Sequence, residues 1–133
     1  MSLKAGLFAH LTADVAIAAA VGTKVYPTIA PQDVVWPFVV YDVTRDEEFQ
    51  FHSGPSGLHN ATVQVRVQTT SQPDAESIGR LVYDALRATD GGWGDVTVAR
   101  VAAQPPEVVF VPGTDRLDTF QASIDVEVQY YSE

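Results

Sequence analysis

Residues 120–130 read FQASIDVEVQY, an unbroken alternation of apolar and polar side chains. Successive side chains of a β-strand point to opposite faces of a sheet, so this period of two predicts a strand with one buried and one wet face. It is the longest such run in the chain, and we expect it to be a long or central strand. Residues 60–69 repeat the pattern, with Val63, Val65 and Val67 on one side, which predicts a second strand of the same kind.

Two segments show helical periodicity instead. In residues 71–87 apolar side chains recur every three or four positions, with Ser71 placed to cap the helix and Pro73 in its first turn. A second apolar face, near the N-terminus, consists of Leu3, Leu7, Phe8 and Leu11. Asp14 follows as another helix-start signal, which favours a break or kink there.

A long hairpin is predicted between these helices. Residues 38–43, FVVYDV, are dense in strand formers and run on through TRDEE into FQFH at residues 49–52. The cluster SGPSG at residues 53–57 is typical of a turn. The stretch from residue 46 to residue 60 is therefore predicted to form an arm that extends beyond the core. Residues 96–101 are predicted as another strand, and residues 107–111 as a short one.

Together these elements predict one domain, residues 1–133, of the α+β class. We expect a mainly antiparallel β-sheet with two helical segments packed on one face and a long projecting hairpin arm. The other face of the sheet should be polar and either solvent-exposed or part of an interface. Its predicted residues are Gln64, Arg66, Gln68, Asp125, Glu127 and Gln129.

Composition excludes several classes of function. Seventeen acidic against eight basic residues give a net charge of −9, which argues against gripping nucleic acid as a primary role. The chain has no cysteine, which excludes disulfides, thiolate metal sites and a cysteine nucleophile. The most apolar stretch, residues 15–21, is too short to span a bilayer, and the first residues make a poor signal peptide. We therefore expect a cytoplasmic protein without membrane contact.

The histidines are the first candidates for chemistry. His10 has no partner at metal-ligand spacing, whereas His52 and His59 flank the predicted turn, near the acidic residues 46–48. A metal site there would need these carboxylates as further ligands. Because no known ligand spacing is matched, two solvated loop histidines are the simpler interpretation.

Other motifs give no catalytic site. Ser56 lies between glycines, but no strand-to-helix step follows it, as a nucleophile elbow requires. The glycine-rich GGWG at residues 91–94 follows a helix, whereas a phosphate loop precedes one. We predict no catalytic residue, no bound metal, no cofactor and no small-molecule substrate.

The predicted arm carries the candidate interaction residues. Phe49 and Phe51 alternate along it, and two aromatic side chains on a projecting arm suggest a partner surface. Gly54, Pro55 and Gly57 would set the geometry of its tip. These five residues are the predicted oligomer interface.

Four blocks of the chain also carry a family resemblance. They are residues 3–27, residues 31–41 (PQDVVWPFVVY), SGPSGL at residues 53–58 leading into VQV at 63–65, and SIDVEVQYY at residues 123–131. In their order and spacing these blocks resemble the tail-completion proteins, also called tail-terminator or head–tail joining proteins, of long-tailed bacteriophages and prophages. The resemblance covers nearly the whole chain.

The resemblance implies a structural role without catalysis. Such proteins form a ring, commonly of six subunits, at the head-proximal end of the tail tube, where the ring stops tube growth and joins tail to head. The implied partners are further copies of the chain, the tail tube protein and a head-completion or connector protein. DNA would pass through the ring without specific binding. The implied location is the head–tail junction of the virion, after assembly in the cytoplasm of a bacterial host.

Three alternatives remain open at this point. The protein could be another head–tail connector or head-completion protein, which composition does not separate from a terminator. It could be a small metal-binding protein or enzyme that uses His52 and His59. It could also be a host adaptor domain with no phage connection.

Overall fold

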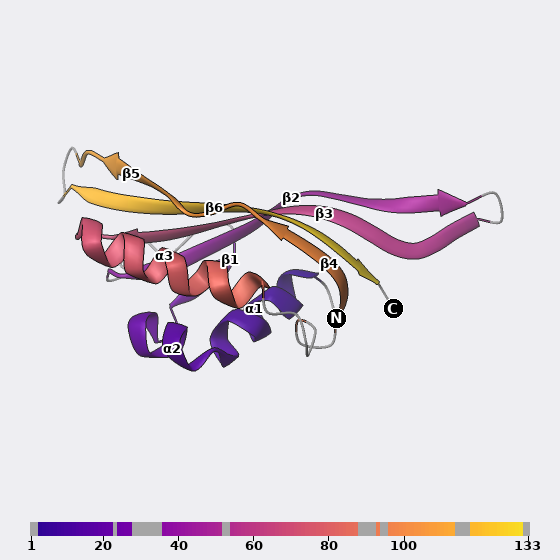
Figure 1. Ribbon diagram of the computed structural model, residues 1–133, viewed down its shortest axis with the longest axis horizontal. Helices are drawn as coiled ribbons and strands as arrows, with labels where there is room; N and C mark the ends of the chain where they lie inside the picture. Colours follow the sequence, from indigo (N-terminus) through magenta and orange to yellow (C-terminus); the bar gives the residue numbers. More distant parts are fainter. Residues whose placement is uncertain are drawn as a thin grey trace.

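A computed structural model describes residues 3–22, 24–27, 36–51, 54–87, 93, 96–113 and 118–131. Its elements are α1 (Leu3–Ala13), α2 (Val15–Val21), β1 (Val25–Pro27), β2 (Phe38–Phe51), β3 (Gly54–Thr69), α3 (Gln72–Arg87), β4 (Thr97–Ala103), β5 (Glu107–Val111) and β6 (Thr119–Tyr131). The helices lie on one face of the sheet, while β2 and β3 continue together far beyond it (Figure 1). The α+β prediction is confirmed.

The strand predicted from residues 120–130, β6, lies inside the sheet and pairs with three other described strands. The strand order is β1-β2-β3-β6-β4, and β5 also pairs with β6. On one side β6 forms a long antiparallel ladder with β3, in which Val63 lies opposite Val126. On its other side it pairs antiparallel with β4 and then β5. Only the short β1, on β2, is parallel among the described strand pairs.

The N-terminal helix breaks at Asp14, as its sequence predicts. The Asp14 carboxylate accepts a hydrogen bond of 3.0 Å from the Ile17 backbone N–H, and α1 and α2 are bent by 85° at this point. One predicted helical segment is therefore two helices. The prediction that Phe8 lies on the buried face is wrong, because its side chain is 40% exposed. Leu3, Leu7 and Leu11, each about one turn apart, already form the face that contacts the core.

No described helix alone is long and apolar enough to cross a membrane; α1 and α2 reach that length and composition only as a pair, across their bend.

Helix α3 packs its predicted stripe on the sheet. Ile78, Val82 and Leu86 are buried, and so is Gly79. A Cβ atom at Gly79 would lie 2.9 Å from the Ala122 Cβ, closer than carbon atoms pack. The absence of a side chain there lets α3 approach β6 closely.

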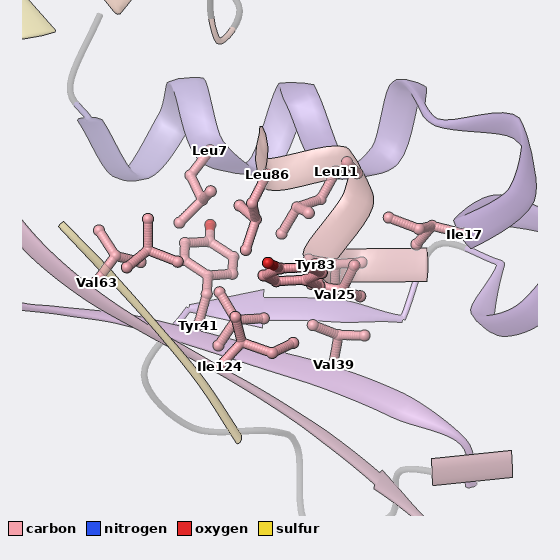
Figure 2. Close-up of a cluster of buried hydrophobic side chains, with 14 of the residues drawn as sticks. Leu7, Leu11, Ile17, Val25, Val39, Tyr41, Val63, Tyr83, Leu86 and Ile124 are labelled. Carbon is pink, nitrogen blue, oxygen red and sulfur yellow. The ribbon is translucent and has the colours of Figure 1, made fainter. Parts of the chain in front are cut away.

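The core lies between the helices and the inner face of the sheet. Figure 2 shows side chains from every helix meeting those of the sheet in one cluster. Its labelled members are Leu7, Leu11, Ile17, Val25, Val39, Tyr41, Val63, Tyr83, Leu86 and Ile124. The inner residues of β3 and β6 are those that the alternation in the sequence assigns to the buried face.

The long hairpin is confirmed, but its turn is placed differently. Strands β2 and β3 pair from Phe38 opposite Gln68 out to Phe51 opposite Gly54. The turn predicted over residues 53–57 is wrong for 54–57, which belong to β3, and Ser53 lies outside the described residues. Gly57 has a φ of 78° inside the strand, and the register shifts between Glu48 and Gln50. The glycine therefore serves an irregular strand instead of a turn.

Candidate functional site

The most extended feature of the molecule is the arm, defined here as residues 46–60. The last pair of the ladder between β3 and β6 is Leu58 with Tyr131, and β4 ends its own ladder opposite Tyr131 as well. Beyond this pair, β2 and β3 have only each other among the described strands, and they project from the body (Figure 1). An isolated two-stranded hairpin is marginally stable at best. The contacts at the base of the arm therefore decide how firmly it is held.

Four polar and aromatic side chains meet at this base, and we call them the arm-base cluster: Asp46, Glu48, His59 and Tyr130. The Tyr130 hydroxyl donates a hydrogen bond to Asp46 Oδ2. His59 Nδ1 lies 3.0 Å from Asp46 Oδ1, and its Nε2 lies 3.7 Å from Glu48 Oε2. The His59 and Tyr130 rings stack with their centroids 5.0 Å apart. These contacts link β2, β3 and β6 through side chains as well as backbone.

The position of this cluster follows from the strand period. The buried positions of β3 run Val67, Val65, Val63 and Ala61, and the next residue on that face is His59. His59 pairs with both Glu48 and Tyr130 across the sheet. The arm-base cluster is thus the polar continuation of the inner face, at the point where the apolar core stops. Glu48 Oε2 also accepts a hydrogen bond of 3.1 Å from the Gly57 backbone N–H, which bridges the two strands of the arm.

The histidine predictions have mixed outcomes. The prediction of His59 as a solvated loop residue is wrong, because β3 begins at Gly54 and includes it. His10 packs structurally: its Nε2 lies 2.6 Å from the Ala85 carbonyl oxygen, and its ring stacks on Trp93. His52 lies outside the described residues.

The predicted interface residues lie where the arm is longest. Phe49 and Phe51 belong to β2, and Gly54, Pro55 and Gly57 belong to β3. Phe51 pairs with Gly54 at the end of the ladder. The side chains of Phe49, Phe51 and Pro55 are outside the described part of the structure, so their role in an interface stays a prediction.

The arm-base cluster links the arm to β6 through side-chain contacts. Within the described ranges, no three His, Asp or Glu side chains could hold a metal ion. The groups of the cluster contact each other. Sequence reasoning missed the partnership of Asp46 with Tyr130; the only signal for it was that Tyr130 continues the buried alternation of its strand.

The open face of the sheet is polar, as predicted. Gln64 Nε2 donates to Asp125 Oδ1 over 3.3 Å. A groove of about 590 Å³ lies beside it, and its walls include Glu107, Asp125 and Glu127. Its charged walls are therefore acidic.

The hydrogen bond between Tyr130 and Asp46 can be tested through its pH dependence. Burial, followed by the hydrogen bond to Asp46 and the charge of that carboxylate, raises the pKa of Tyr130 well above its usual value. The folded state therefore keeps the phenolic proton longer than the unfolded state does. The resulting stability is complete below about pH 10, the ordinary tyrosine pKa, and is lost as the pH rises above it.

We expect Tyr130→Phe to lower the free energy of unfolding by about 1–2 kcal/mol at pH 7. The variant should also lose less stability between pH 9 and 11 than the wild type. Tyr41, whose pKa is also raised by burial, leaves part of the slope in place. Urea unfolding at several pH values measures both effects. Tyr131→Phe, on the exposed neighbour, is the control, and an unchanged slope in Tyr130→Phe would contradict the assignment.

Fold and site together define a small α+β protein with a projecting arm whose base makes side-chain contacts with the sheet. The chain belongs to the tail completion protein gp17 family, whose sequence profile matches residues 5–131. It is therefore a structural protein of phage tails. The predicted family resemblance is confirmed.

A solved structure shares the fold over nearly the whole chain. It is described as the virion of a native gene transfer agent particle, and it superposes with a TM-score of 0.75 at 18% sequence identity. The match covers 98% of this chain and 96% of the other. The comparison with curated proteins gives no significant match.

Proposed function

We propose that this tail completion protein forms a ring of six copies at the head-proximal end of the tail tube. The ring stops tube growth and joins the tail to the head. Family membership supports a role in completing the tail. The observation that carries the proposal further is the arm, which extends past the body (Figure 1) and is tied to the sheet by the arm-base cluster.

An arm of this kind suits ring formation. In a closed ring one surface of each copy meets a different surface of the next, so the protein must present two unlike contact regions. A projecting hairpin reaches a neighbour without moving the body, and a fixed base sets its direction. Six chains of 14.4 kDa would weigh about 86 kDa.

The acidic charge suits the passage of DNA. A lumen of negative charge repels phosphate, so that DNA moves through without sticking. We propose that the open face of the sheet, with Asp125 and Glu127 exposed, supplies part of this charge. The remaining partners are the tail tube protein below the ring and a head-completion or connector protein above it. The site of action is the head–tail junction of the virion, after assembly in the host cytoplasm.

In vitro complementation tests the proposal. Extracts of cells infected with a phage that lacks this gene should contain tails that cannot join heads. Adding the purified chain should restore infectious particles in proportion to the amount added, until all tails are capped. Tyr131→Phe, a conservative change at an exposed position, should restore the titre as well as the wild-type protein does. Extracts that are already infectious without added protein would contradict the role.

A further inference from the structure

Strand β5 leaves one edge of the sheet open at the end away from the arm. It pairs with β6 through one edge only, with Val109 opposite Gln121 and Phe110 opposite Phe120. No other described strand pairs with it. The N–H and C=O groups along such an edge are a template for a strand of another chain.

The side chains of β5 add apolar surface to this edge. Val109 is 45% and Phe110 is 51% exposed, and as successive strand residues they point to opposite faces. Phe110 contacts Phe120, with ring centroids 5.4 Å apart. Proteins commonly protect an edge with charged residues or proline inside the strand. In β5 the only charged residue is Glu107, the first of the strand, and residues 108–111 read VVFV.

We propose that the outer edge of β5 receives the hairpin arm of a second copy of this chain. The inference rests on the proposed function, because a ring requires a second surface for the arm to contact. It goes beyond that function by assigning this surface.

The distribution of charge identifies the occupant. The chain has a net charge of −9, so two copies repel each other over most of their surfaces. Residues 49–65, which include the outer part of the arm, contain no Asp, Glu, Lys or Arg, and neither do residues 108–113. These two segments can therefore meet without burying a formal charge, which would be costly.

The backbone geometry also matches. Strand β1 pairs with β2 only at residues 39–41, so the outer edge of β2 has no described partner from residue 42 to residue 51. The uncharged part of this edge, residues 49–51, spans roughly 10 Å, and the five residues of β5 span about 15 Å. The uncharged end of the arm is thus long enough to pair with residues 109–111 and leave Glu107 outside the contact.

The placement of the two edges makes the contact intermolecular. Strand β5 and the end of the arm lie at opposite ends of the long axis (Figure 1). One copy cannot bring them together without unfolding its sheet. Between copies the contact is head-to-tail, which is the type that closes into rings.

Site-directed cross-linking tests the contact, and the chain has no native cysteine to interfere. Val109→Cys and Gln50→Cys would be placed in separately tagged copies and expressed together in a phage that lacks the gene. A short bismaleimide reagent added to the lysate should yield a product that contains both tags. Neither variant alone should cross-link to itself. Glu76→Cys, on the exposed face of α3, replaces Val109→Cys in the control and should give no product.

The outcomes separate this inference from the proposed function when tail length is imaged in parallel. Correctly terminated tails without the mixed product would overturn the contact alone. Self-cross-linking of Val109→Cys would also overturn it, since it would indicate β5 pairing with β5. Overlong tails together with the mixed product would support the contact between β5 and the arm, and would count against the proposed role in tail termination. Overlong tails without the product would count against both.

A blocking variant gives a second readout. Val109→Lys places a charge on the edge and should prevent assembly, while the exposed side chain leaves folding unaffected. Val15→Lys, at a position 83% exposed on α2, carries the same change away from the edge and should assemble normally. Normal assembly of a folded Val109→Lys protein would overturn the inference.

Discussion

Combined replacement of Phe49 and Phe51 by alanine is expected to weaken ring assembly by more than about tenfold, while the protein still folds. Aromatic anchors commonly contribute 2 kcal/mol or more to an interface, and about 1.4 kcal/mol corresponds to a factor of ten. The proposed ring would repeat the same contact at every subunit boundary. A loss at each boundary therefore disfavours the closed ring more than it would a single dimer.

The fold should survive because the core lies elsewhere. The described core draws on β2 only as far as Val43 and on β3 only from Ala61 onward. The two phenylalanines lie outside this span, in the part of β2 that pairs only with β3. Unfolding of the double variant should therefore resemble that of the wild type.

Two assays measure this effect. One is the capping of tails from a phage that lacks this gene, and the other is sedimentation of the isolated chain. Gln50→Ala, between the two phenylalanines, is the matched control and should assemble almost normally. If the double variant caps tails as the wild type does, the arm is not the contact.

The largest expected effect on stability comes from Gly6→Ala. A Cβ atom at this position would lie 2.5 Å from the Trp93 carbonyl oxygen and 2.7 Å from Val96 Cγ2. Trp93 is fully buried, and Trp93 and Val96 exchange two backbone hydrogen bonds of 3.0 Å. The obstructing atoms are therefore backbone and core atoms that cannot easily move.

Two opposing terms decide the sign of this effect. Alanine is favoured over glycine inside a helix by about 1 kcal/mol. Overpacking of a close-packed core costs about 1–3 kcal/mol and sometimes more. A backbone oxygen at such a short distance puts Gly6 at the upper end, so we expect a net loss of about 2 kcal/mol in the free energy of unfolding.

Urea denaturation of Gly6→Ala measures this loss. Ala5→Gly, at the exposed neighbouring position of the same helix, calibrates the helix-propensity term. If Gly6→Ala were as stable as the wild type or more so, α1 could not lie this close to Trp93.

The sequence predicts those parts of the fold that depend on local pattern. The alternation in β6 and β3 identifies their buried faces, and the capping residue Asp14 identifies the break between α1 and α2. Glycine and proline are ambiguous, however, because they also occur in irregular strands. Residues 54–57 were therefore predicted as a turn, although they belong to β3.

The arm-base cluster could not be predicted from local sequence patterns, for a different reason. Asp46 and Tyr130 are 84 residues apart, and only the register of three strands brings them together. His59 acquires its partners in the same way. A contact with a second copy would involve a surface outside the single chain. The interface role of Phe49 and Phe51 therefore remains a prediction from the aromatic pattern alone.

The most direct test of the proposed role is to delete this gene from the phage or prophage that encodes it and to measure tail lengths by negative-stain microscopy. Termination and joining by this protein predict overlong tails together with free, filled heads. Tails of normal length without heads would indicate a connector that joins but does not control length. Normal, infectious particles in the deletion strain would contradict the proposed role.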